Sequence, residues 1–104
     1  MRDEYIIVSK KYRRPLSENN MYILFWRPNS RGYTYSLDSA GLYCREYLDK
    51  EGIKNNEDMI VVDATKLQKI AIGAPADADN SMPYLAVLNS AANWATIETM
   101  SKEI

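Results

Sequence analysis

The feature that most constrains the fold is the apolar run at 21–26, MYILFW, and the way in which it ends. A nearly continuous apolar run of this length is typical of a strand that is buried on both faces of a sheet. Pro28 ends the strand, because proline cannot donate a hydrogen bond to a neighbouring strand. Turn-forming residues follow at 29–32, where Gly32 is free to adopt a positive φ, and Tyr33–Tyr35 can form a short return strand. We therefore expect a hairpin whose tip carries Arg27, Asn29, Ser30 and Arg31.

The clearest helical pattern begins directly after this hairpin. Its apolar residues fall at helical spacing on one stripe: Leu37, Ala40, Cys44, Tyr47 and Leu48. Ser36 or Asp38 can cap its first turn, and Gly52 fits a left-handed stop, with Leu48 and Ile53 in contact as in a Schellman motif. The pattern places Cys44 in the core as a small buried residue, since free cysteines are often buried.

The rest of the chain alternates strand-like and helix-like segments. Strands are predicted at 5–8, 59–62 and 84–88, a short helix at 64–70 capped by Asp63, and a surface loop at 73–83. Residues from Ala91 to Ile97 favour a helix capped by Asn89 or Ser90, and the alternative is a hairpin, because 96–99 alternates and is β-branched.

This order of elements indicates one α+β domain over residues 1–104. We expect a small mixed or antiparallel sheet of about four to five strands, with two to three helices packed on one face. The predicted core is Ile6, Val8, Ile23, Phe25, Leu37, Ala40, Cys44, Leu48, Ile60, Val62, Leu67, Ile70, Leu85, Val87 and Trp94.

Composition excludes several kinds of chemistry. The chain has no His and a single Cys, which removes His-based acid–base catalysis, Cys–His and Ser–His nucleophiles and the common zinc sites. We predict that the protein is not an enzyme and has no cofactor. A calcium loop at Asp77 to Asn80 is disfavoured, because the glycine and glutamate of that motif are absent. The net charge of −1 gives no general attraction to nucleic acid. No segment resembles a signal peptide or membrane span, so we expect a cytoplasmic protein.

The hairpin tip is the candidate ligand site. Arginine binds phosphate through paired hydrogen bonds, a glycine-containing turn offers backbone N–H groups, and tyrosine faces stack on bases. A basic cluster at 10–20 is the second source of cations. The predicted ligand-binding residues are Arg27, Asn29, Ser30, Arg31, Gly32, Tyr33 and Tyr35, with Arg13 and Arg14 from the basic cluster. The alternative is that these arginines are solvated surface charges and the tyrosines pack on the sheet.

Two stretches of the chain resemble a group of small phage-encoded proteins of undefined function. The first contains RPN at 27–29, GYT at 32–34 and AG-x-Y at 40–43, and the second contains VLN at 87–89 followed by Asn93-Trp94. Together they cover about a third of the chain. The resemblance implies a phage-type accessory protein that acts in the host cytosol and is not an enzyme, and it supplies no catalytic residues.

Two functions are consistent with this resemblance and with the residues at the tip. The first is to counteract host defence by sequestering a phosphate-bearing, nucleotide-like molecule, in a pocket that a second subunit would help to complete as a homo-oligomer. The alternative is a protein–protein inhibitor of a host defence enzyme such as a CRISPR effector, with the Tyr-rich hairpin as its contact surface. A ligand pocket requires the Arg and Tyr side chains to converge around a concavity, whereas an inhibitor needs a broad exposed face.

Overall fold

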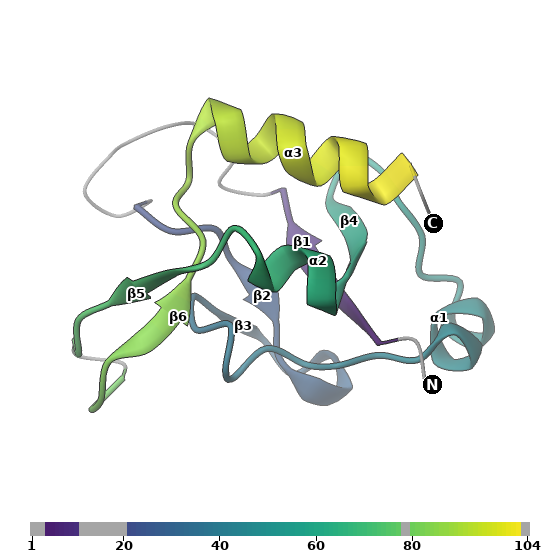
Figure 1. Cartoon of the computed structure of the whole chain (residues 1–104). Coiled ribbons are helices and arrows are strands. Elements are labelled where there is room, and N and C mark those ends of the chain that lie inside the picture. Colours follow the sequence, from purple (N-terminus) through teal and green to yellow (C-terminus); the bar gives the residue numbers. More distant parts are fainter. Residues whose placement is uncertain (1–3, 11–20, 78–79, 103–104) are drawn as a thin grey trace.

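The computed structural model of this chain describes residues 4–10, 21–77 and 80–102 (Figure 1). The main sheet is antiparallel, with the strand order β3-β2-β1-β4, and a second sheet pairs β5 with β6. The strands are β1 (Tyr5–Ser9), β2 (Phe25–Trp26), β3 (Tyr33–Thr34), β4 (Met59–Asp63), β5 (Ile72–Ala74) and β6 (Tyr84–Ala86). The helices are α1 (Arg45–Glu51), α2 (Ala64–Gln68) and α3 (Ala91–Lys102), and a 3-10 turn, η2, spans Pro28–Ser30. The predicted α+β class is confirmed.

Both faces of the main sheet are buried. Side chains alternate along β1, so Ile6 and Val8 point to one face while Tyr5 and Ile7 point to the other. The first face packs against α2 and α3, and its core is Ile6, Val8, Ile23, Phe25, Leu37, Ala40, Ile60, Val62, Ala64, Leu67, Val87, Trp94 and Ile97. The second face packs against α1, and its core is Tyr5, Ile7, Tyr43, Leu48 and Val61. The helices therefore divide between the two faces, which differs from the expected packing on one face; Figure 1 shows α3 and α2 on the side away from α1.

The apolar run at 21–26 is not one continuous strand. Only Phe25–Trp26 forms β2, and it pairs with β3 and β1. Earlier in the run, Tyr22 forms an isolated bridge with Leu88, and the Ile23 N–H donates to Val87 O at 2.9 Å. The run changes partners partway along its length. It thereby links the main sheet to the segment that leaves β6.

The predicted helix after the hairpin is wrong in its first half. Helix α1 begins at Arg45, and Cys44 is its half-buried N-cap instead of a core residue. The chain before it is extended, since Tyr43 and Tyr5 exchange two backbone hydrogen bonds of 2.8 Å. Pairing with β1 outweighs the helical pattern here, because tertiary contacts override local propensity. The predicted helix stop is confirmed: Gly52 has φ +67°, and the Ile53 N–H donates to Leu48 O at 2.9 Å.

Helices α2 and α3 begin next to the capping residues that the sequence predicts. Asp63 caps α2 by accepting a hydrogen bond from the Lys66 N–H at 3.1 Å, as predicted. Residues 91–102 form helix α3 and not the alternative hairpin, and Ser90 Oγ accepts from the Asn93 N–H at 3.2 Å in its first turn. The predicted core position Leu85 is wrong, because its side chain is 41% exposed on the open face of β6.

The predicted surface loop at 73–83 starts as a strand, because its first two residues belong to β5. Further along, the Asp77 carboxylate accepts hydrogen bonds from the Asn80 N–H (2.9 Å) and the Tyr84 hydroxyl (2.7 Å), which ties the loop together. Within the part of the chain that the structure describes, no group of three or more His, Cys, Asp or Glu is placed to hold a metal ion. Over the same residues, no helix is long and apolar enough to cross a membrane.

Candidate functional site

The hairpin predicted from the strands at 21–26 and 33–35 is present, formed by β2 and β3 over 25–34, and two residues with positive φ shape its tip. Trp26 pairs with Tyr33 across the strands, and the Arg27 N–H donates to Gly32 O at 2.8 Å to close the turn. Asn29 has φ +59° and Gly32 has φ +95°. Asparagine and glycine tolerate this region better than other residues, so the sequence at the tip suits this turn. The positive φ expected at Gly32 is confirmed.

The segment that follows the hairpin folds back against its tip. The Gly41 N–H donates to Trp26 O at 2.8 Å, and the Tyr43 hydroxyl donates to Arg27 O. A Cβ at Gly41 would lie 2.8 Å from Pro28 N and 2.9 Å from the Arg27 carbonyl carbon, closer than real Cβ contacts. Gly41 thus permits close backbone approach to the hairpin, where a helical position had been expected. The Arg27 backbone is fixed from outside the hairpin.

A hollow of about 250 Å³ opens beside the hairpin, and we call it the Arg27 hollow. It is lined by Leu24, Arg27, Tyr33, Thr34, Tyr35 and Asn80. Its volume lies below the roughly 300–1,000 Å³ of typical small-molecule pockets. The hollow is therefore large enough for one group of a ligand, such as a phosphate or a base, while the rest of the ligand would lie across the exposed turn.

The Arg27 guanidinium is oriented by the hairpin itself. Its Nε donates to Tyr33 O at 3.1 Å, although the side chain is exposed. Over the described residues, the two terminal nitrogens of Arg27 have no hydrogen-bond or ion-pair partner. These nitrogens form one edge of the planar fork that binds carboxylate or phosphate through two parallel hydrogen bonds. The hairpin thus presents a preoriented anion-binding group at the hollow.

The aromatic lining has one exposed and one packed ring. Tyr33 is 46% exposed, and its ring meets Trp26 edge to face at 6.4 Å between centroids. Tyr35 is half-buried and packs against the third apolar cluster, formed by Ala74, Tyr84 and Ala86. On the far side, Asn80 is held by Asp77 through its backbone and side chain. The hollow therefore lies between the hairpin and the β5–β6 sheet.

The structure brings together three of the predicted site residues, namely Arg27, Tyr33 and Tyr35. Asn29, Arg31 and Gly32 lie on the exposed turn outside the lining, and Ser30 belongs to η2. Arg13 and Arg14 fall outside the described residues. Sequence reasoning missed Leu24, Thr34 and Asn80 as lining residues. Thr34 lies between Tyr33 and Tyr35 in the sequence, and Leu24 directly precedes β2, which pairs with β3. No local signal connects Asn80 to the hairpin.

Comparison of the chain with protein families, curated proteins and solved structures gave no match. The geometry of the site is therefore the main basis for inferring a function.

Proposed function

We propose that this protein binds a small, phosphate-bearing, nucleotide-like molecule at the Arg27 hollow without transforming it. The observation that carries the proposal is the convergence of Arg27, Tyr33 and Tyr35 around one concavity. Arginine and aromatic side chains are the groups that recognise phosphate and base respectively. A convergent site of this kind favours a ligand pocket over a broad docking face.

The size and position of the hollow indicate how such a ligand would lie. A phosphate group would accept hydrogen bonds from the terminal nitrogens of Arg27, and a base would stack on the exposed ring of Tyr33. The remaining ligand atoms would extend over the turn that carries Asn29 and Arg31. The biological role in this proposal is sequestration of a nucleotide signal of host defence, which rests on the resemblance to phage-encoded proteins.

Thermal-shift measurements test this proposal directly. The purified protein is screened against linear and cyclic nucleotides, ADP-ribose derivatives and inorganic phosphate, because a ligand that binds the native state raises the melting temperature by mass action. We expect a ligand-specific rise that Arg27→Ala abolishes. Arg31→Ala is the matched control, since Arg31 lies on the same turn but outside the lining, and it should keep most of the rise.

Arg27→Ala should leave the free energy of unfolding within about 0.5 kcal/mol of the parent value, since Arg27 is exposed. Chemical denaturation checks this, so that lost binding is not confused with lost folding. The absence of any thermal shift at millimolar ligand would contradict the proposal. The protein-inhibitor function would then be the better one, with the exposed turn as its contact surface.

A further inference from the structure

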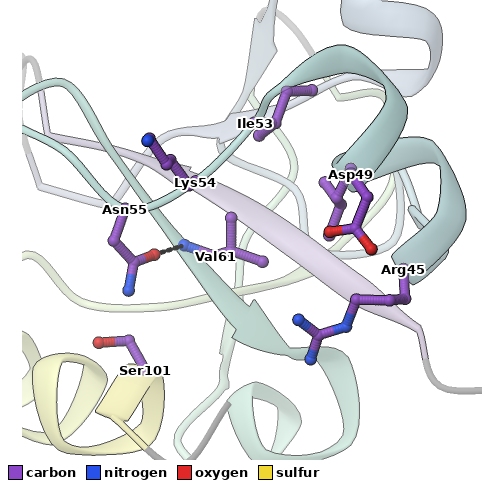
Figure 2. Close-up of a pocket in the computed structure, with 8 residues that line it drawn as sticks. Arg45, Asp49, Ile53, Lys54, Asn55, Val61 and Ser101 are labelled. Carbon is purple, nitrogen blue, oxygen red and sulfur yellow. Dashed lines mark hydrogen bonds between the residues drawn. The ribbon is translucent and has the colours of Figure 1, made fainter.

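The asparagine amides that line two separate hollows are used differently. In a hollow of about 340 Å³ beside α1 and β4, Asn55 Oδ1 accepts a hydrogen bond from the Val61 N–H at 2.7 Å (Figure 2). The amide oxygen of Asn55 therefore serves the backbone of β4. In the Arg27 hollow, by contrast, it is the amide nitrogen of Asn80 that is held within the protein. This difference leaves the Asn80 oxygen available to a ligand.

Asp77 fixes Asn80 at three points. The Asp77 N–H donates to Asn80 O at 2.9 Å, and Asp77 Oδ1 accepts from the Asn80 N–H at 2.9 Å and from Asn80 Nδ2 at 3.3 Å. Both backbone groups and the side-chain nitrogen of Asn80 are thus bonded to one residue. A side chain that is already held in this way loses little further freedom when a ligand binds.

Asp77 is itself anchored to a buried ring. The Tyr84 hydroxyl donates to Asp77 Oδ2 at 2.7 Å. Tyr84 is buried in the third apolar cluster, where its ring meets Tyr22 edge to face at 6.2 Å between centroids. The position of Asn80 is therefore tied, through Asp77, to the packed side of the β5–β6 sheet. Asp77 acts as a positioning residue for Asn80.

The carboxylate partner also determines which end of the Asn80 amide is left over. An ionised carboxylate only accepts hydrogen bonds, so the amide nitrogen must be the atom that faces Asp77. Asn80 Oδ1 is the remaining atom, and over the residues that the structure describes no donor is bonded to it. The Arg27 hollow thus combines the N–H donors of Arg27 with an oxygen acceptor from a different element.

We propose that Asn80 Oδ1 selects, among nucleotides bound at the Arg27 hollow, those whose base carries an exocyclic amino group. This inference rests on the function proposed above. The amino group of a base such as adenine would donate to Asn80 Oδ1, while the ring lies on Tyr33 and the phosphate on Arg27. A base that lacks this donor would leave the oxygen unpaired in the complex, which lowers the affinity.

The experiment compares AMP with purine riboside 5′-monophosphate, which differs from AMP only in lacking the amino group. Isothermal titration calorimetry gives Kd for each ligand. We expect the parent protein to bind AMP about tenfold more tightly, because the second ligand loses one hydrogen bond to a preoriented acceptor. UMP is the third ligand, since its base carries a carbonyl oxygen in place of an amino group, and it should also bind more weakly than AMP.

Two variants locate the origin of this preference. Asn80→Ala removes the acceptor, so AMP and purine riboside 5′-monophosphate should bind about equally well, both still held by Arg27. Ser81→Ala is the matched control, because Ser81 is exposed on the same turn and lies outside the lining, and it should keep the preference for AMP. Circular dichroism should show both variants folded, since Asn80→Ala keeps the two backbone hydrogen bonds to Asp77.

The possible failures of the inference and of the proposed function are distinguishable. Equal binding of AMP and purine riboside 5′-monophosphate to the parent protein would overturn the inference and leave nucleotide binding intact. A preference for AMP that persists in Asn80→Ala, or binding of UMP without binding of AMP, would do the same. If none of the three ligands binds at millimolar concentration, the inference falls together with the proposed function.

Discussion

The hairpin and the β4 edge of the main sheet are stabilised in different ways. The hairpin tip is held through the carbonyls of Trp26 and Arg27, which accept hydrogen bonds from the Gly41 N–H and the Tyr43 hydroxyl. At the β4 edge, outward-facing backbone groups are satisfied by residues just before the strand: Asn56 Oδ1 accepts from the Met59 N–H at 3.1 Å, and Asn55 Oδ1 accepts from the Val61 N–H at 2.7 Å. Covering the β4 edge in this way also prevents pairing with another chain. The hairpin thus depends on tertiary contact, and the β4 edge depends on local side chains.

The hairpin should be the more sensitive of the two regions to a single methyl group. Gly41→Ala would place a Cβ within 3 Å of the backbone of Arg27 and Pro28, so the two segments must separate. We expect the free energy of unfolding to fall by about 1–3 kcal/mol, as for other overpacked sites. Urea denaturation followed by circular dichroism measures this.

Gly73→Ala in β5 is the matched control for Gly41→Ala. A Cβ at Gly73 would meet no atom of the described residues within 4 Å, so this variant should be neutral or slightly stabilising. If Gly41→Ala were equally harmless, the close approach of the two segments would not matter to stability, and the contrast between the hairpin and the β4 edge would fail.

The β4 edge should respond to loss of one acceptor. Asn55→Ala leaves the Val61 N–H without its partner and should lower the free energy of unfolding by about 1–2 kcal/mol. Asn55→Asp keeps an acceptor oxygen and should restore most of this stability. Hydrogen exchange of the Val61 amide provides a local readout: it should accelerate in the alanine variant and remain slow in the aspartate variant.

A smaller effect is expected from the hydroxyl that contacts the hairpin. Tyr43→Phe removes the donor to Arg27 O but keeps the ring that packs against Tyr47, at 5.4 Å between centroids. The expected loss is about 1 kcal/mol in denaturant melts. An unchanged midpoint would show that the Tyr43 hydroxyl does not contribute to the stability of the hairpin.

The smallest expected effect is an increase in the free energy of unfolding. The N-cap of helix α1, Cys44, is in an extended conformation, and over the described residues its side chain accepts no capping hydrogen bond. Serine is a favoured N-cap residue, so Cys44→Ser should raise the free energy of unfolding by about 0.5 kcal/mol. Cys44→Ala, which supplies no cap, should give no gain, and an equal gain for both variants would exclude capping as the cause. Differential scanning calorimetry resolves the difference.

The features that the sequence predicts well are those determined within a few residues. The Gly52 helix stop, the Asp63 cap and the left-handed Gly32 each depend on local geometry, and each is present. The start of α1 depends instead on pairing between Tyr43 and Tyr5, which a helical pattern at 37–48 gives no reason to expect. Long-range pairing competes with local propensity, and here it prevails.

The second core and the candidate site also combine features that local sequence determines with features that only tertiary packing determines. The continuous apolar runs of β1 and β4 are typical of strands buried on both faces, yet the identity of the covering helix depends on tertiary packing. Arg27, Tyr33 and Tyr35 share the hollow because one hairpin carries them. Asn80 reaches it from the turn between β5 and β6, and that approach is set by the arrangement of the two sheets.

The central position of β1 has a consequence for synthesis of the chain. Val8 pairs with Phe25 and Tyr5 pairs with Asp63, so both neighbours of β1 leave the ribosome after it. The pairing of Tyr5 with Asp63 closes the longer of the two loops. This step is slow, because the chain loses conformational entropy before the contacts between β1 and β4 form. Until then the apolar side chains on both sides of β1 have no cover, and exposed segments of this kind are the ones that chaperones protect. Strand β1 of the nascent chain must therefore be kept from aggregating until β4 has left the ribosome.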